Sequence, residues 1–118
     1  MDYKLGAEYI DLGKFLDKLQ KTTVSLVNTL FKGNITCINF KEELSNLISL
    51  VDKIEPRLSD EEINNKKRGI YGIAFVEVTK KGLGDKCDNL AKYLDEKIKV
   101  LGAKTDINCN NLRNLLYT

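Results

Sequence analysis

The apolar residues in the first quarter of the chain recur at alternating spacings of four and three, and this periodicity most limits the folds open to the sequence. The stripe consists of Leu5, Tyr9, Leu12, Leu16, Leu19, Thr23, Leu26 and Leu30. Residues at this spacing lie on one face of an α-helix, which turns once in 3.6 residues. The polar segment 20–23 ends in two β-branched threonines, so residues 7–32 form either one helix or two. In either case, Gly33-Asn34 ends the helical segment.

Capping signals predict where the following helices begin. Asn39 with Glu42 three residues later has the spacing of a capping box, and the helix that it starts ends at Pro56. The face of this helix includes Leu47 and Ile48. Ser59 with Glu62 is a better capping box, and the three carboxylates at 60–62 are favoured there by the helix dipole.

Residues 70–78 are the most apolar segment, and two structures remain open for it. Their β-branched and aromatic side chains suit a buried strand, paired with residues 35–40, or a central helix buried nearly all round. We favour the helix, because the surrounding segments are helical and Gly82 lies where a C-cap is expected. Asp85 then caps a helix that ends at Gly102, and Asn108 or Asn110 starts a last short one.

These segments together predict an all-α fold, a single-domain bundle of five to seven helices spanning residues 1–118 around a central apolar helix. A chain of 118 residues is long enough to bury one core and too short for two. Its longest apolar run, at residues 70–76, is far shorter than a membrane span, so we expect no integral membrane segment.

Composition excludes several functional classes. The absence of histidine removes Ser-His-Asp and Cys-His catalytic systems and histidine-ligated metals, so we expect a protein that is not an enzyme and binds no metal or cofactor. A net charge of +2 argues against nucleic-acid binding. Cys37, Cys87 and Cys109 form no C-x-x-C pair. We therefore expect three reduced thiols, which favours a reducing compartment such as the cytosol or nucleus.

The sequence offers only weak catalytic or phosphate-binding motifs. The carboxylates at 60–62 are explained by helix capping, and Gly82-Leu83-Gly84 lacks both the preceding strand and the Lys-Ser/Thr of a phosphate loop. Gly72 is more informative, because a glycine in a helix costs about 1 kcal/mol relative to alanine. With Phe75 nearby, it would form a smooth patch for the close approach of a partner helix, or for internal packing.

Three segments resemble motifs of the Bcl-2 family. Residues 68–78, Arg-Gly-Ile-Tyr-Gly-Ile-Ala-Phe-Val-Glu-Val, are similar to its first homology motif, with the best match at Ala74 and Phe75. Residues 88–98 resemble its sixth helix, and residues 111–117, Asn-Leu-Arg-Asn-Leu-Leu-Tyr, are similar to its second homology motif. The motif arginine falls at Tyr71 in an ungapped alignment, so Arg68, one turn earlier, is the nearest substitute.

This resemblance implies a short, virus-encoded Bcl-2-like inhibitor of host apoptosis without a membrane anchor. Such a protein would bind the amphipathic BH-3 helix of pro-apoptotic host proteins in an apolar groove and sequester them in the host cytoplasm. The groove residues that it implies are Leu47, Ile48, Arg68, Tyr71, Gly72 and Phe75. The alternative is a helical immunity, anti-defence or adaptor protein that acts through another surface. A homodimer is compatible with either reading.

Overall fold

The computed structural model describes residues 2–5 and 8–117, with side chains described for residues 4–5 and 9–102. It contains four α-helices: α1 (Leu12–Phe31), α2 (Cys37–Ser49), α3 (Asp60–Lys80) and α4 (Lys86–Tyr117). A 3-10 helix, η1 (Leu50–Lys53), extends α2. The mainly helical prediction is confirmed, whereas the predicted number of five to seven helices is wrong and the Bcl-2-like arrangement is not confirmed.

A small antiparallel sheet, absent from the all-α prediction, precedes α1. Strands β1 (Asp2–Leu5) and β2 (Glu8–Asp11) form a hairpin, and β3 (Ile54–Glu55) pairs with β1, in the order β2-β1-β3. Leu5 pairs with Glu8 across the hairpin and with Ile54 of β3. The helical spacing of the apolar stripe therefore continues by coincidence through Leu5 and Tyr9 into the hairpin.

One uninterrupted helix, α1, accounts for the remainder of the stripe. Asp11 caps it by accepting hydrogen bonds from the backbone N–H groups of Gly13 and Lys14. Thr23 does not break the helix, although it is fully buried, because its hydroxyl donates to the Leu19 carbonyl at 2.8 Å. Gly33, with φ of 76°, follows the helix and allows the reversal into α2.

Helix α3 confirms the helical reading of residues 70–78 and the capping box that starts it. The Ser59 hydroxyl accepts from the Glu62 N–H at 3.2 Å and lies 3.3 Å from the Glu62 carboxylate. The cap of α2, in contrast, is Thr36 rather than Asn39, because the Thr36 hydroxyl accepts from the Asn39 N–H.

The predicted break at Gly102 does not occur, and α4 continues to Tyr117 without a separate last helix. Its beginning is irregular: Cys87, Asp88 and Asn89 all have left-handed backbone conformations, with φ of 55°, 56° and 70°. The Asn89 side chain accepts from the Lys92 N–H, so Asn89, and not Asp85, has the capping contact. No helix in the described part of the chain is long and apolar enough to span a membrane.

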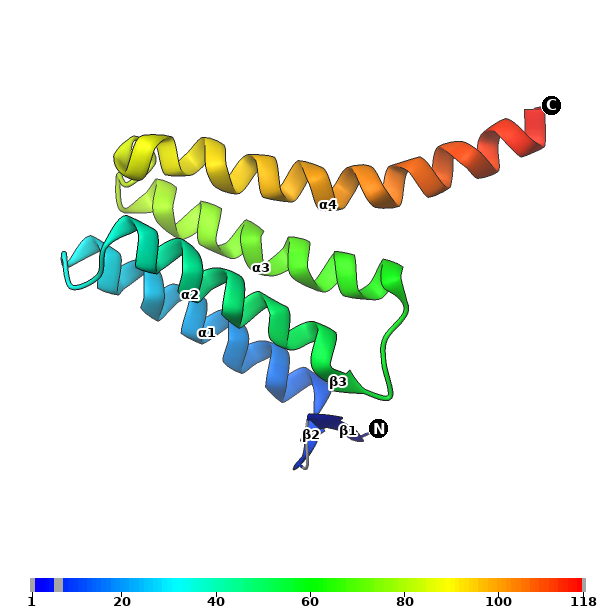
Figure 1. Ribbon diagram of the computed structural model, residues 1–118, viewed down its shortest axis with the longest axis horizontal. Coiled ribbons are helices and arrows are strands. Elements are labelled where there is room, and N and C mark those ends of the chain that lie inside the picture. The colour runs from blue at the N-terminus through cyan, green and yellow to red at the C-terminus, as the bar shows by residue number, and fades with distance from the viewer. Residues whose placement is uncertain (1, 6–7, 118) are drawn as a thin grey trace.

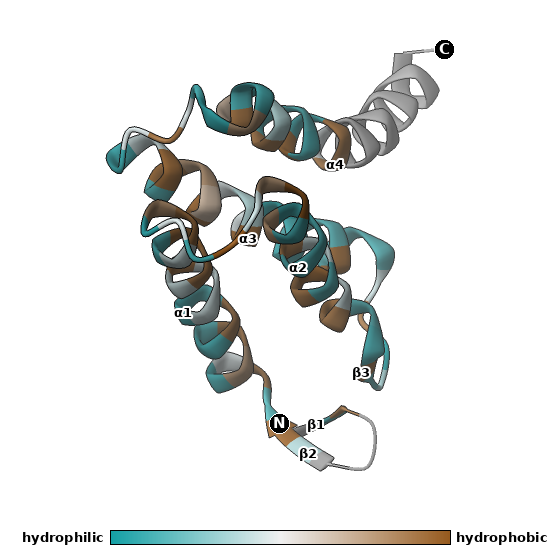
Figure 2. Ribbon diagram, turned by 60° about the vertical axis from the view of Figure 1, so that its left-hand side comes forward, coloured by the Kyte–Doolittle hydropathy of each residue, from teal (hydrophilic) through white to brown (hydrophobic). Residues whose placement is uncertain are grey.

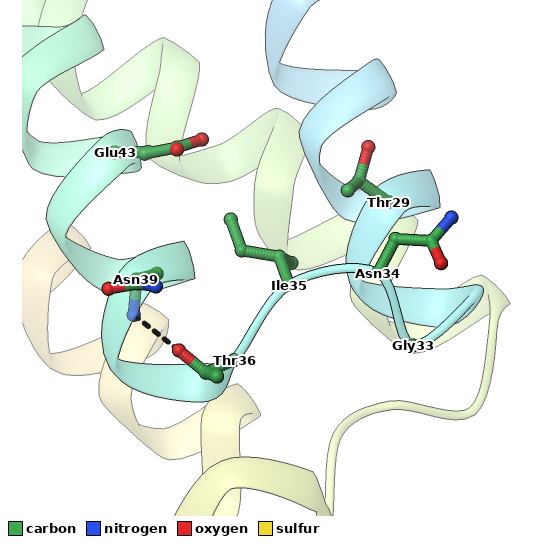
Figure 3. Close-up of a pocket in the computed structure, with 7 residues that line it drawn as sticks. All are labelled: Thr29, Gly33, Asn34, Ile35, Thr36, Asn39 and Glu43. Carbon is green, nitrogen blue, oxygen red and sulfur yellow. Dashed lines mark hydrogen bonds between the residues drawn. The ribbon is translucent and has the colours of Figure 1, made fainter.

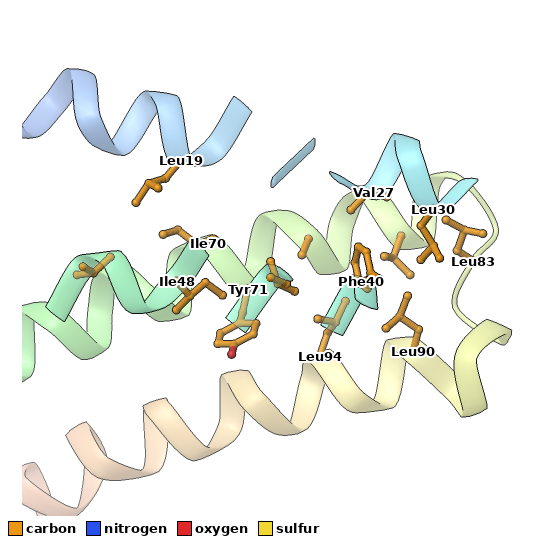
Figure 4. Close-up of a cluster of buried hydrophobic side chains, with 14 of the residues drawn as sticks. Leu19, Val27, Leu30, Phe40, Ile48, Ile70, Tyr71, Leu83, Leu90 and Leu94 are labelled. Carbon is orange, nitrogen blue, oxygen red and sulfur yellow. The ribbon is translucent and has the colours of Figure 1, made fainter. Parts of the chain in front are cut away.

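Helix α3 lies between α1 and α4, and α2 packs over the core that these helices share (Figure 1). Each helix shows both brown and teal residues in Figure 2, as expected where one apolar side is turned inward. The core joins all four helices (Figure 4). Its most enclosed large side chains are Phe40, Leu44, Ile54, Leu90 and Leu94.

A disulfide between Cys37 and Cys87 corrects the expectation of three reduced thiols. The two sulfur atoms are bonded and join the start of α2 to the start of α4 across 50 residues of sequence. Nothing in the spacing of the cysteines indicated the pair, because the helices bring together residues that are remote in the chain. The cysteine content therefore no longer favours a reducing compartment.

Candidate functional site

Of the predicted groove residues on α3, three lie on the side that α4 covers. Tyr71 is 8% exposed, and Figure 4 shows its ring between α3 and α4. Burial, together with the neighbouring Tyr93 phenol of α4, raises the pKa of Tyr71. Phe75 is partly buried against the same core. The Arg68 side chain lies against α4 at Gly102, where an added Cβ would lie 3.2 Å from its guanidinium carbon. An internal helix therefore lies along this side of α3.

Gly72, the fourth predicted residue on α3, faces open space. A Cβ built at Gly72 would meet no described atom within 4 Å, and the same holds for Gly69 one turn earlier. Internal packing of a helix against Gly72, one of the two alternatives that the sequence left open, is therefore not seen in the described part of the molecule. The glycines leave a smooth strip on α3 next to Val76, which is 49% exposed.

The two predicted residues on α2 point in different directions. Ile48 is 3% exposed and belongs to the core, whereas Leu47 is half-buried and lines hollows between α1 and α2. The structure thus separates Leu47 from the α3 residues with which it was grouped. Leu47 instead marks a different surface.

Three open hollows follow one another along the seam between α1 and α2, and we call their sum the α1–α2 groove. The first, next to the β-hairpin, has a volume of about 490 Å³, and the second about 350 Å³. They share Thr22, Leu47 and Leu50. The second meets a third, of about 470 Å³, at Glu43. The groove therefore extends from the hairpin to the turn between the two helices.

The hairpin end and the middle of the α1–α2 groove are mainly apolar. Their apolar lining residues come from β1, β2, α1, α2 and η1: Leu5, Ile10, Phe15, Leu19, Leu26, Leu47 and Leu50. Thr22 adds to this character, because its hydroxyl donates to the Lys18 carbonyl at 2.7 Å and is therefore already satisfied. Exposed apolar surface in a groove is a common feature of sites that bind amphipathic helices.

The far end of the α1–α2 groove is polar and is shown in Figure 3. It is lined by Thr29, Gly33, Asn34, Ile35, Thr36, Asn39 and Glu43. Thr36 is engaged as the cap of α2, whereas the Glu43 carboxylate has no hydrogen bond or ion pair among the described residues. A free carboxylate therefore lies where the apolar middle meets this end.

Two cations lie on the α1 rim at the opposite end. Lys14 and Lys18 are exposed, line the hollow next to the hairpin and form no ion pair with any described residue. Asp11 also lines this hollow, and its carboxylate, which caps α1, keeps its negative charge, so these three side chains carry a net charge of +1 (two cations and one anion). The α1–α2 groove is therefore positive at the hairpin and negative toward the turn.

A second polar cluster surrounds the disulfide. The Lys41 ammonium lies 4.6 Å from the centre of the Tyr93 ring and donates to the Cys87 carbonyl at 3.4 Å. Lys97 lies 5.5 Å from the same ring. Asp88 and Glu96 line the hollow beside them, so opposite charges are mixed. These contacts support the left-handed turn that starts α4, and we assign them a structural role.

Catalytic and metal-binding groups are sparse in this part of the chain. The described residues contain no cluster of three or more His, Cys, Asp or Glu side chains that could hold a metal ion. The carboxylates at 60–62 lie in the first turn of α3, as the capping interpretation predicts. The α1–α2 groove is therefore the strongest candidate site.

Of the residues predicted for a ligand groove, only Leu47 lines the α1–α2 groove, and the α1 side of this groove was not predicted. The available signal was Phe15, an apolar residue just outside the stripe, which widens the apolar face of α1 toward Lys14 and Lys18. Comparisons with protein-family models, with curated proteins and with solved structures find no match for this chain. The candidate function therefore rests on the groove and on the sequence resemblance.

Proposed function

We propose that this protein acts by binding an amphipathic helix of a partner protein in the α1–α2 groove. The observation that carries this proposal is the continuous line of hollows, apolar in its first two thirds, with two unpaired lysines at the hairpin end and an unpaired carboxylate where the apolar part meets the polar end. Burial of an aliphatic stripe in such a groove supplies most of the affinity, and charged groups at the rim add specificity.

The resemblance to the Bcl-2 family makes the BH-3 helix of pro-apoptotic host proteins the first ligand to test. Binding would sequester that helix and inhibit apoptosis from the host cytoplasm, as expected of a virus-encoded relative. Support for this identity of the ligand comes from the sequence segments at 68–78, 88–98 and 111–117. The α1–α2 groove supports helix binding of any origin equally well.

A helical immunity, anti-defence or adaptor protein is the second candidate, and two observations favour it. Burial of Ile48 and Tyr71 in the core speaks against a groove built on α3. The Cys37–Cys87 disulfide is typical of oxidising compartments rather than of the cytosol. In this case the same α1–α2 groove would take a helix without a BH-3 pattern.

Calorimetric titration with a panel of BH-3 peptides tests the first ligand. Each peptide is paired with a version whose motif leucine and aspartate are replaced. Dissociation constants below about 1 μM, equivalent to roughly 8 kcal/mol, that are lost with the altered peptides would support BH-3 recognition. Absence of binding across the panel would reject BH-3 recognition and leave the second candidate.

Two variants locate the binding surface. Leu47→Lys places a charge in the apolar middle of the α1–α2 groove, whereas Gly72→Tyr covers the open strip on α3. We expect Leu47→Lys to weaken binding by tenfold or more and Gly72→Tyr to leave it unchanged. Val100→Lys, at a residue that is 56% exposed on α4, is the matched control. Loss of binding in Gly72→Tyr alone would reject the α1–α2 groove.

A further inference from the structure

The charges at the two ends of the α1–α2 groove bear on the direction of the bound helix. From Lys14 to Thr29, the residues of α1 that line the groove span about 22 Å, at 1.5 Å per residue. A helix of about 15 residues, or four turns, matches this length. Such a ligand reaches both ends at once, so its own ends meet different charges.

The dipoles of the two helices that form the groove contribute little to the direction of the bound helix. Helix α1 runs from the hairpin to the turn and α2 runs back, so the dipole of each opposes that of the other. The charged side chains therefore determine the direction: Lys14 and Lys18 outweigh Asp11 at the hairpin, and Glu43 lies toward the turn. None of these four side chains forms an ion pair with a described residue.

We propose that the bound helix lies parallel to α2, with its C-terminal turn at Lys14 and Lys18 and its N-terminal turn near Glu43. This inference rests on the proposed helix-binding function and adds the direction and the charge of the ligand. The carbonyl end of a helix carries partial negative charge and its N–H end partial positive charge, so this direction pairs opposite charges at both ends. The same surface favours a ligand with carboxylates in its last two turns.

Two designed peptides of the same composition test the direction. Both have 15 residues and one leucine stripe. The first carries two glutamates in its last turns and two lysines in its first, and the second carries them in reverse. The charges of the first peptide oppose its own helix dipole, so each dissociation constant is corrected for the helix content of the free peptide. After this correction, we expect the first peptide to bind the full chain about tenfold more tightly at low salt. The preference should shrink at 1 M salt, where exposed charges are screened within about 3 Å.

A spin label gives a readout of direction that does not depend on affinity. With the label at the C-terminal end of the first peptide, we expect the amide resonances of Tyr9 and Ile10 to broaden. With the label at the N-terminal end, those of Asn34 and Ile35 should broaden instead, because they lie at the polar end of the groove.

Charge reversal supplies the matched variants. Lys14→Glu with Lys18→Glu should remove or invert the preference between the peptides. Lys86→Glu with Lys92→Glu, at exposed positions of α4, makes the same change in net charge and should leave the preference intact. Labels that report the opposite direction, or equal corrected affinities for the two peptides, would overturn the inference while the proposed function stands, provided that Leu47→Lys still weakens binding by tenfold or more.

Two results would overturn the proposed function together with the inference. One is no binding of either peptide at millimolar concentration. The other is a peptide-independent dimer that is dissociated by Leu47→Lys, because the groove would then be occupied by a second copy of the chain. Sedimentation of the free protein at several concentrations separates this case from a monomer that binds peptide.

Discussion

At the scale of single residues, the glycines of α3 are notable because no packing contact requires them. Gly69 and Gly72 lie inside a long helix, where each costs about 1 kcal/mol relative to alanine. An added Cβ would meet no described atom within 4 Å at either position. No close contact within the described molecule therefore compensates for their cost in helix stability.

Gly72→Ala should raise the free energy of unfolding by about 0.5–1 kcal/mol, because alanine favours the helix and finds open space. Gly33→Ala is the matched control, since Gly33 has φ of +76° and a side chain there should cost about 1–2 kcal/mol. Urea unfolding of both variants measures the two changes. A destabilised Gly72→Ala variant would show that an unseen contact covers this position.

Tyr71 provides a prediction for alkaline pH. Burial raises its pKa, with a further contribution from Tyr93, so the folded protein holds the phenolic proton more tightly than the unfolded chain does. The corresponding stability is fully present below about pH 10 and is lost as the pH rises through the folded-state pKa. Tyr71→Phe should therefore unfold with a weaker pH dependence above pH 10 than the parent protein.

Urea unfolding between pH 8 and pH 11 measures this difference. Tyr9→Phe, at a residue that is 78% exposed, serves as the control and should follow the parent curve. If Tyr71→Phe lost stability with pH as steeply as the parent, the Tyr71 phenol would not be the source of the dependence.

At the scale of elements, local signals predicted the helices with strong caps and failed where distant contacts decide. Ser59 with Glu62 indicated the start of α3, and Gly33 the end of α1. The hairpin was missed, because Leu5 and Tyr9 continue a helical spacing while the pairing of Leu5 with β3 is a long-range contact. The irregular start of α4 was missed for the same reason, since the disulfide and Lys41 hold it from α2.

Removal of the α3 cap tests the element that local sequence predicted best. Ser59→Ala should lower the free energy of unfolding by about 1 kcal/mol, because the Glu62 N–H loses its acceptor. Ser59→Asp keeps an acceptor and should remain within about 0.5 kcal/mol of the parent. Thermal or urea unfolding distinguishes the two. Equal losses in both variants would show that the serine hydroxyl itself is needed, and not merely a hydrogen-bond acceptor at the cap position.

The candidate site shows the same division between local and distant contacts. Leu47 could be identified because its helix was predicted, but its partners on α1 depend on how the two helices pack. Arg68 and Tyr71 were predicted to face a ligand helix, whereas the helix that lies against them is α4 of the same chain. Helix faces can be read from periodicity, but the element that covers each face cannot.

At the scale of the whole molecule, the disulfide joins two of the four helices and encloses α3 between its ends. A loop closed across 50 residues loses enough unfolded-state entropy to stabilise the fold by about 4 kcal/mol in the chain-entropy account. The total for a domain of this size is about 5–15 kcal/mol, so this one bond is a substantial share.

Cys37→Ser with Cys87→Ser should therefore lower the free energy of unfolding by about 4 kcal/mol. Unfolding of the parent with and without reductant measures the same difference, and the variant should not respond to reductant. Denatured, unreduced parent protein should offer at most one thiol per chain to a thiol reagent. Three titratable thiols in that assay would contradict the disulfide.

The loop that the disulfide closes also determines how the molecule would respond to mechanical force. With handles attached at Lys14 and Lys97, tension would pass directly from Cys37 to Cys87 through the sulfur atoms. Helix α3, the η1 turn and most of α2 lie within the closed loop and would carry no load once the rest had unravelled. In a pulling experiment the oxidised chain should extend about 170 Å less than the reduced chain, which is the contour length of those 50 residues.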